Sequence, residues 1–312
     1  MTNTLCSRLL GYSGCVLEVH RQDSRTWVRK RSPDLTFNAK FQWEIRKIER
    51  LNGLGAESKL FAAPEIISTG TEDEIAFYDM EYVVGQTLEF RIDSMDAKEL
   101  RSTARLLNEI HAFFASQTPL ENPPAELSEW RYLVSKLEET LSFLEGNAVP
   151  LPAESGLVST YRERLEELSG RSFDWRSKPT FCHGDLALDN VLVTRQGRIY
   201  LLDPLFNAFE TVAWDRAKVL QSSLLQWDKI KRGEIRVDPK EGKIISGGSG
   251  KMQIFNLAYI GTDGQGIEPS RLLLYLGVTM ARIVKYAKDR GQAETLLALV
   301  NQLLGRYLRG GA

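Results

Sequence analysis

The residues best suited to chemistry lie between positions 181 and 203. Two β-type runs in this stretch flank a turn centred on Gln196-Gly197. If the runs pair as a hairpin about that centre, Asn190 and Asp203 face each other at its open end. An amide carbonyl and a carboxylate placed side by side suit a hard divalent ion such as Mg²⁺. The spacing therefore predicts a metal site formed by these two side chains.

A third polar side chain belongs to the same stretch. Asp185 lies only a few residues before Asn190, so its side chain can lie over the open end of the hairpin. Phosphoryl transfer needs metal ions on the phosphates and a carboxylate that orients and deprotonates the attacking hydroxyl. The three residues together indicate a phosphotransferase site.

The pattern His183-x-Asp185-x-x-x-x-Asn190, followed by Asp203, resembles the catalytic and metal-binding loops of the protein-kinase-like fold. Gly184 between the histidine and the aspartate is similar to the aminoglycoside phosphotransferase and choline kinase branch. The resemblance implies that Asp185 is the catalytic base and that Asn190 and Asp203 hold Mg²⁺. It further implies ATP as the phosphate donor and a hydroxyl of a small molecule as the acceptor.

Further parts occur in the order that this family has. Lys30 ends a β run and resembles the strand lysine that binds nucleotide phosphates, a role that requires an acidic partner. Glu44 lies in the apolar, inward stripe of the next helix, with Phe41 and Ile48, whereas Glu49 is rotated away from it. The sequence therefore predicts a pair between Lys30 and Glu44.

Two other segments are expected to contact the nucleotide. Ser13 and Gly14 end a short glycine-containing run before the first strand, which departs from the usual phosphate-covering pattern. The segment from Met80 resembles the link between the two lobes, and its backbone is expected to contact adenine near Glu81 and Val83.

The elements that must position these residues change in character near Gly85. Before Gly85 the sequence pattern predicts short strands and one helix around 41–51, which Gly53 and Gly55 are expected to end. The later segments read as helices, and 229–266 reads as a long loop or β-excursion. We expect a two-lobed α+β fold of the protein-kinase-like type. Its N-lobe, residues 1–85, binds the nucleotide, and its C-lobe, residues 86–312, carries the catalytic loop and the acceptor site. Downstream, Asp215 resembles the residue that braces the catalytic loop.

Composition excludes several other classes. The 40 Lys and Arg residues nearly balance the 41 Asp and Glu residues, so the chain lacks the basic field typical of nucleic-acid binding. No apolar run approaches the roughly 20 residues of a membrane span. The three scattered cysteines fit a reducing, cytoplasmic setting. His111 and His183 are expected to be structural.

The acceptor is harder to predict. Lysines gather in 229–251, which favours a neutral or anionic sugar-like alcohol over a cationic aminoglycoside. Two alternatives stay open: a protein kinase, although 204–213 is short for an activation segment, and an ATP-binding pseudokinase with a regulatory role.

Overall fold

The computed structural model describes residues 4–10, 15–146, 156–171, 175, 178–234, 250–261 and 268–310. By its internal contacts the chain divides into two compact units. The first contains residues 1–91, 183–185 and 189–207, and the second contains 92–182, 186–188 and 208–312. The short hairpin segment expected to carry the chemistry therefore clusters with the N-terminal residues, although it follows them at a distance in the sequence. The boundary expected at Gly85 stays a prediction.

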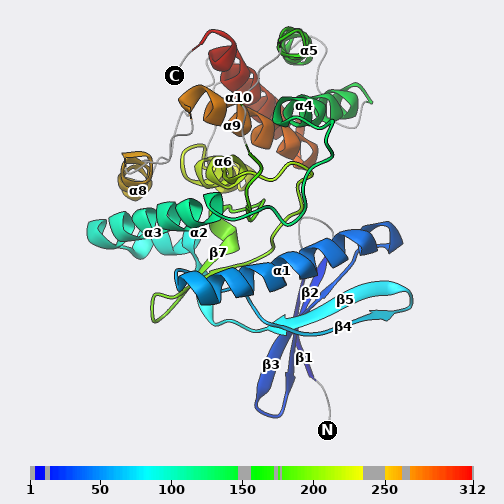
Figure 1. Ribbon diagram of the computed structural model, residues 1–312, viewed down its shortest axis with the longest axis vertical. Coiled ribbons are helices and arrows are strands. Elements are labelled where there is room, and N and C mark those ends of the chain that lie inside the picture. The colour runs from blue at the N-terminus through cyan, green and yellow to red at the C-terminus, as the bar shows by residue number, and fades with distance from the viewer. Residues whose placement is uncertain are drawn as a thin grey trace. The chain divides into compact units, whose positions relative to one another are not determined.

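The first unit is built on a five-stranded antiparallel sheet. Its strands are β1 (Thr4–Leu10), β2 (Val16–Gln22), β3 (Arg25–Arg31), β4 (Ile66–Glu72) and β5 (Ile75–Glu81), in the order β1-β2-β3-β5-β4. The long helix α1 (Asn38–Ser58), preceded by η1 (Leu35–Phe37), packs on this sheet (Figure 1). The apolar stripe of α1 is buried there through Phe41, Ile45 and Ile48, as its helical spacing requires.

A second, three-stranded sheet completes the first unit. It consists of β6 (Gly85–Thr87), β7 (Val191–Thr194) and β8 (Ile199–Leu201), in that order. Ala62 pairs with Tyr200 of β8, which joins the chain after α1 to this sheet. The short helices α2 (Leu88–Arg91) and η4 (Leu188–Asn190) lie next to its strands in sequence.

The second unit is helical within its described residues. Its elements are η2 (Ile92–Ser94), α3 (Ala97–Ala115), α4 (Glu129–Glu145), α5 (Leu157–Ser169), α6 (Val212–Ser223), α7 (Trp227–Lys231), α8 (Gly250–Gly261), α9 (Pro269–Ile283), η5 (Val284–Tyr286) and α10 (Arg290–Leu308). Helix α9 packs on α6 and α10 (Figure 1), and Trp214, Tyr275 and Leu304 are fully buried there. The expected α+β class, with a β-rich first part and helices after it, is confirmed.

Two expectations about elements are wrong. Helix α1 does not end at Gly53 or Gly55 but continues to Ser58. A Cβ atom on Gly55 would lie 2.7 Å from the carbonyl oxygen of Phe61, so this glycine permits close packing and does not stop the helix.

The segment 229–266 also contains more structure than a long loop. Helix α8 occupies residues 250–261 because Met252, Phe255 and Tyr259 recur at helical spacing and are buried. Within the described residues, no helix combines the length and the apolar character that crossing a membrane requires.

Candidate active site

The β7–β8 hairpin differs from the expected pairing by one residue. Val191 pairs with Leu201 and Val193 with Ile199, so the backbone of Asn190 meets Leu202, whose N–H donates to the Asn190 carbonyl at 2.9 Å. The expectation that Asn190 directly faces Asp203 is therefore wrong. The reason is the turn, whose three-residue loop ends at Gly197 with φ of +78°. A loop with a left-handed glycine in its last position shifts the centre of the hairpin by half a residue.

Asn190 and Asp185 are nevertheless in direct contact. The Asn190 side-chain nitrogen donates to the Asp185 carbonyl oxygen at 2.8 Å and lies 3.3 Å from its Oδ2. Both residues are half-buried. Since the amide nitrogen is turned to Asp185, the amide oxygen of Asn190 is the atom that can serve a ligand.

Asp203 follows the hairpin with a backbone conformation that is uncommon for a residue with a side chain. Its φ is +57°, in the left-handed region. Such outliers concentrate at functional sites, where surrounding contacts hold them in place. Its side chain is 53% exposed and pairs with the ammonium group of Lys30. The fold thus brings Asp203 and Lys30 together although they are far apart in sequence.

Lys30 is the centre of a buried charge cluster. Its side chain comes from β3, is 6% exposed, and donates to Glu44 Oε1 at 2.5 Å, as the position of Glu44 on α1 predicts. Tyr78 on β5 donates its hydroxyl to the same Glu44 oxygen at 2.5 Å. Burial and the neighbouring Asp203 charge raise the pKa of Glu44 to about 7, against the opposing effect of Lys30. Although burial opposes it, the two carboxylates raise the pKa of Lys30, which stays charged.

His183 and Gly184, which precede Asp185, contact the segment after Asp203. The N–H of Leu205 donates to the His183 carbonyl at 2.9 Å. Gly184 has φ of +89°, and a Cβ atom there would lie 2.0 Å from the Leu205 carbonyl oxygen. Burial, with Lys47 nearby, lowers the pKa of His183 to about 4, so the imidazole is neutral at pH 7. A glycine at position 184 is what this close contact between two backbone segments requires.

Two residues of the site are missing from the sequence prediction. Tyr78 reaches Glu44 from β5, and Lys47, one helical turn after Glu44, donates to the Leu205 carbonyl oxygen at 2.7 Å. Lys47 carries a detectable signal, because a lysine stands within the apolar stripe of α1 next to Ile48. Tyr78 carries none, since a tyrosine in a strand is ordinary.

The remaining predicted residues are less informative. Ser13 and Gly14 lie outside the described residues. The expectation that their run precedes the first strand is wrong, because β1 (Thr4–Leu10) comes before it in the chain. Glu81 ends β5 and donates its N–H to the Glu65 carbonyl at 2.9 Å, while Val83 lies in the chain between β5 and β6. Asp215 is buried in α6 of the second unit. Their expected contacts with adenine and the catalytic loop stay predictions.

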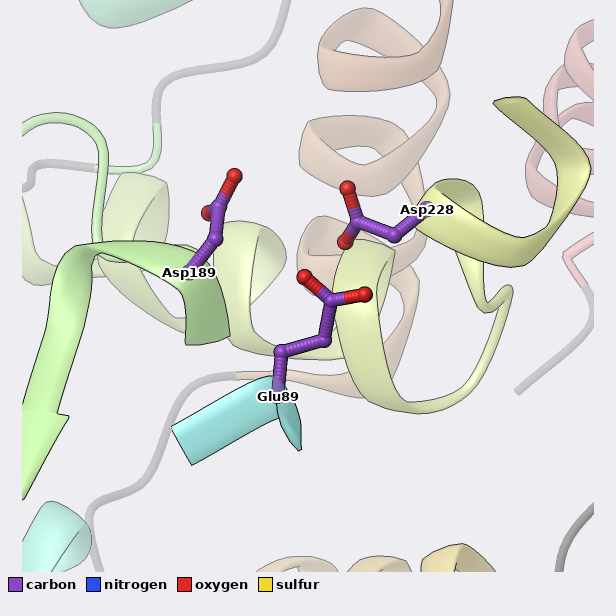
Figure 2. A group of neighbouring side chains, drawn as sticks. All are labelled: Glu89, Asp189 and Asp228. Atoms are coloured by element: carbon purple, nitrogen blue, oxygen red, sulfur yellow. The ribbon is translucent and has the colours of Figure 1, made fainter. Parts of the chain in front are cut away.

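Another pair of acids consists of Asp189, which precedes Asn190 in the chain, and Glu89, which is distant from it in sequence. Figure 2 shows Glu89 on α2 and Asp189 on η4, whose carboxylate oxygens approach within 4.8 Å. The third side chain in that view, Asp228, comes from α7 of the second unit and pairs there with Lys231 at 3.1 Å. Neighbouring acids of this kind are common on protein surfaces, so the magnesium prediction stays with Asn190 and Asp203.

The first unit also contains an open cavity of about 1180 Å³. It is lined by the β2–β3 turn around Arg25, the end of α1, the chain at 61–67, and the hairpin residues Arg198 and Tyr200. Lys30, Glu44, Asp185, Asn190 and Asp203 are not among its lining residues. Asp79 and Glu81 do line it, so the cavity reaches β5, the strand that carries Tyr78 and ends at the residue expected near adenine.

The donor set at the candidate site fits a hard divalent cation. Asn190 offers an amide oxygen and Asp203 a carboxylate that is half exposed. Mg²⁺ is typically bound by one or two such protein oxygens, and its remaining positions are filled by water and phosphate oxygens. The residues thus suit magnesium held together with a nucleotide.

Residues 9–236 match the model of a family described as the phosphotransferase enzyme family. Because this match spans most of the chain, the protein belongs to that family, and the expected aminoglycoside phosphotransferase and choline kinase-like relationship is confirmed. The chain is accordingly an enzyme, a small-molecule kinase. No curated protein matches it by sequence.

Solved structures of similar fold are distant in sequence. A proposed fructosamine-3-kinase from Haemophilus somnus 129PT has a TM-score of 0.59 at 14% identity, with 97% of this chain and 92% of that one covered. Aminoglycoside phosphotransferase APH(3″)-Id from Streptomyces rimosus has a TM-score of 0.54 at 16% identity, with 88% and 92% covered. APH(2″)-IIa, in a ternary complex with streptomycin and ATP, has a TM-score of 0.53 at 15% identity, with 98% and 91% covered. At these identities the likeness shows the shared fold.

Proposed function

We propose that this phosphotransferase transfers the γ-phosphate of ATP to a hydroxyl group of a small molecule, with Asp185 as the general base. One observation supports this most strongly. Asp185 contacts Asn190, and Asp203 contacts the buried pair of Lys30 and Glu44, all within the first unit. These are the parts that phosphoryl transfer needs: a base, metal ligands and a fixed cation for the phosphates.

Asp185 is suited to act on the acceptor. Its carboxylate is half-buried, and Asn190 contacts its backbone carbonyl and one of its carboxylate oxygens. A carboxylate held in this way accepts the proton of the attacking hydroxyl and orients its oxygen toward the phosphorus. A base contribution of this kind is typically 10²–10⁴-fold in rate.

Lys30 and Glu44 are proposed to hold the nucleotide phosphates. Lys30 is cationic and buried, and Glu44 together with Tyr78 fixes its position. Since Asp203 also pairs with Lys30, phosphate oxygens would share this ammonium group with it. The backbone near Glu81 and Val83 is proposed to bind adenine, and the run with Ser13 and Gly14 to cover the phosphates.

Asn190 and Asp203 are proposed to hold Mg²⁺. When bound, the ion would neutralise charge on the phosphate oxygens during transfer. Of the other residues, Asp185 accepts the proton of the attacking hydroxyl, and Lys30 holds the phosphates of ATP in position.

The acceptor is proposed to be a neutral or anionic sugar-like alcohol. Similar structures include APH(2″)-IIa in a ternary complex with streptomycin and ATP, and a proposed fructosamine-3-kinase. The lysines of 229–251 disfavour a strongly cationic drug as the substrate of this chain.

The decisive experiment is Asp185→Asn with ATP and Mg²⁺ over a panel of sugars, nucleosides, choline and aminoglycosides. We expect turnover to fall at least 100-fold while ATP affinity stays within about threefold, because the amide keeps the shape but cannot accept the proton. Asp73→Asn, the same change at an exposed turn of the same unit, is the control. Equal turnover in the Asp185 variant and the control would disprove the role of Asp185. ATP binding by the unmodified chain with neither phosphorylation of any acceptor nor hydrolysis of ATP would instead favour the pseudokinase alternative.

A further inference from the structure

Helix α1 contacts the segment that follows Asp203 at two points. The Lys47 ammonium group donates to the carbonyl oxygen of Leu205 at 2.7 Å. Four residues earlier on α1, the Trp43 ring stacks on Phe206 with centroids 4.4 Å apart and planes 26° apart. Positions four apart lie on the same side of a helix, so α1 binds residues 205–206 with one face.

The burial of Lys47 requires a reason. Its exposed fraction is 0%, and a lysine is rarely buried completely because its charge loses hydration. A leucine or methionine would fill the same stripe of α1 next to Ile48 at no such cost. The ammonium group donates a charge-assisted hydrogen bond to the Leu205 carbonyl, and such a bond is about twice as strong as a neutral one.

Leu205 is the point where three contacts on this segment meet. Its N–H donates to the His183 carbonyl at 2.9 Å, its carbonyl accepts from Lys47, and this carbonyl lies against Gly184. Two residues earlier, Asp203 holds its left-handed φ of +57°. The position of the Asp203 carboxylate therefore depends on how Leu205 is held.

We propose that Lys47 is a positioning residue that fixes the Asp203 carboxylate for the metal-bound nucleotide. It acts through the Leu205 carbonyl and contacts neither substrate nor metal itself. The inference rests on the proposed function, because it concerns the same site. It assigns α1 two separate tasks: Glu44 orients Lys30 for the phosphates, and Lys47 orients Asp203 for the cation.

Calorimetric binding of ADP, measured once in EDTA and once in saturating Mg²⁺, separates these two tasks. In Lys47→Met we expect the affinity in EDTA to stay within about twofold, because Lys30 and Glu44 are unchanged. The gain in affinity that Mg²⁺ gives should fall about tenfold or more, and half of the gain should require more Mg²⁺. Lys47→Arg, which keeps a charged donor, should recover most of the gain. Lys40→Met, the same change at an exposed site of α1, should match the wild type.

Phe206→Leu keeps the test decisive if Lys47→Met does not fold. It weakens the second contact with α1, and we expect a smaller loss of the Mg²⁺-dependent gain, about threefold. Variants at Lys47 or Phe206 that unfold at lower temperature yet keep the full gain would show a purely structural role and overturn the inference. A wild-type chain that binds no nucleotide under either condition would instead overturn the proposed function, and the inference with it.

Discussion

Gly184→Ala tests how closely residues 183–184, next to the proposed base Asp185, must contact the segment after Asp203. The new Cβ atom would lie 2.0 Å from the Leu205 carbonyl oxygen and 2.8 Å from the Asn207 side-chain nitrogen. Cβ atoms essentially never approach other atoms that closely, and the first of these neighbours is backbone. Leu205 must therefore move away from residues 183–184.

Two costs add up in this variant. An alanine at φ of +89° costs roughly 1–2 kcal/mol from the left-handed conformation. Moving Leu205 weakens its bond to His183, worth about 1 kcal/mol, and its charged bond from Lys47, worth about 2 kcal/mol. We expect the free energy of unfolding to fall by roughly 3–5 kcal/mol. We also expect at least a 100-fold loss of turnover in the folded fraction.

Gly197→Ala is the matched control for this measurement. Gly197 also has a positive φ, +78°, but no atom lies within 4 Å of the position of its Cβ. The free energy of unfolding of Gly197→Ala should therefore fall only by the roughly 1–2 kcal/mol that the left-handed conformation costs an alanine. Urea unfolding followed by circular dichroism measures both variants. If the two lose the same stability within about 0.5 kcal/mol, the contact between Gly184 and Leu205 contributes nothing, and the reasoning is refuted.

Three further predictions follow from the buried polar groups. Lys30→Met should weaken ATP binding about tenfold or more in calorimetry, because the phosphates lose their fixed cation; an unchanged affinity would exclude Lys30 as their ligand. Tyr78→Phe should lower the free energy of unfolding in urea by about 1–3 kcal/mol, because Glu44 loses a hydrogen-bond donor in a buried site; no loss would show that this bond is weak. His111 is buried with its pKa well below the usual value, because burial disfavours the charged ring and Arg216 adds to the effect. The folded protein therefore binds fewer protons than the unfolded chain, so this contribution is lost as pH falls below about 6.5, by at most about 1.4 kcal/mol per pH unit. Between pH 7 and pH 5 the free energy of unfolding should fall less in His111→Asn than in the wild type. An identical pH profile of the two proteins would show that His111 does not cause the pH dependence.

The local pattern was sufficient to predict much of the site. Asp185 and Asn190 are close in sequence, and their contact follows from a loop that leads into a strand. Glu44 was predictable because helical spacing alone distinguishes it from Glu49 as the inward acid of α1, and it does contact Lys30. Periodicity carries this information because it decides which side of an element faces the core.

Other features depend on contacts that no local pattern contains. The hairpin register differs by one residue from the expected one, because Gly197 closes a three-residue turn. The same sequence is compatible with a two-residue turn, so the residue types alone do not decide between the two registers. Lys47 became part of the site through Leu205, which is distant in sequence. Helix α1 continues past Gly55, where the absence of a side chain lets the Phe61 backbone pack closely against the helix.

The first unit is formed by segments that are distant in sequence, and this affects how the polypeptide folds. Strand β6 pairs with β7, and Ala62 pairs with Tyr200, so residues 183–207 complete a layer that begins before residue 91. Residues 92–182 intervene and belong to the other unit. A fragment truncated after Arg91 would therefore expose an unpaired strand edge. It would keep Glu44 but lack Asp203, the other carboxylate that pairs with Lys30, and Leu205, whose carbonyl accepts from Lys47. During biosynthesis this part of the enzyme stays incomplete until the intervening helices have been made, and closing so large a loop favours slow folding.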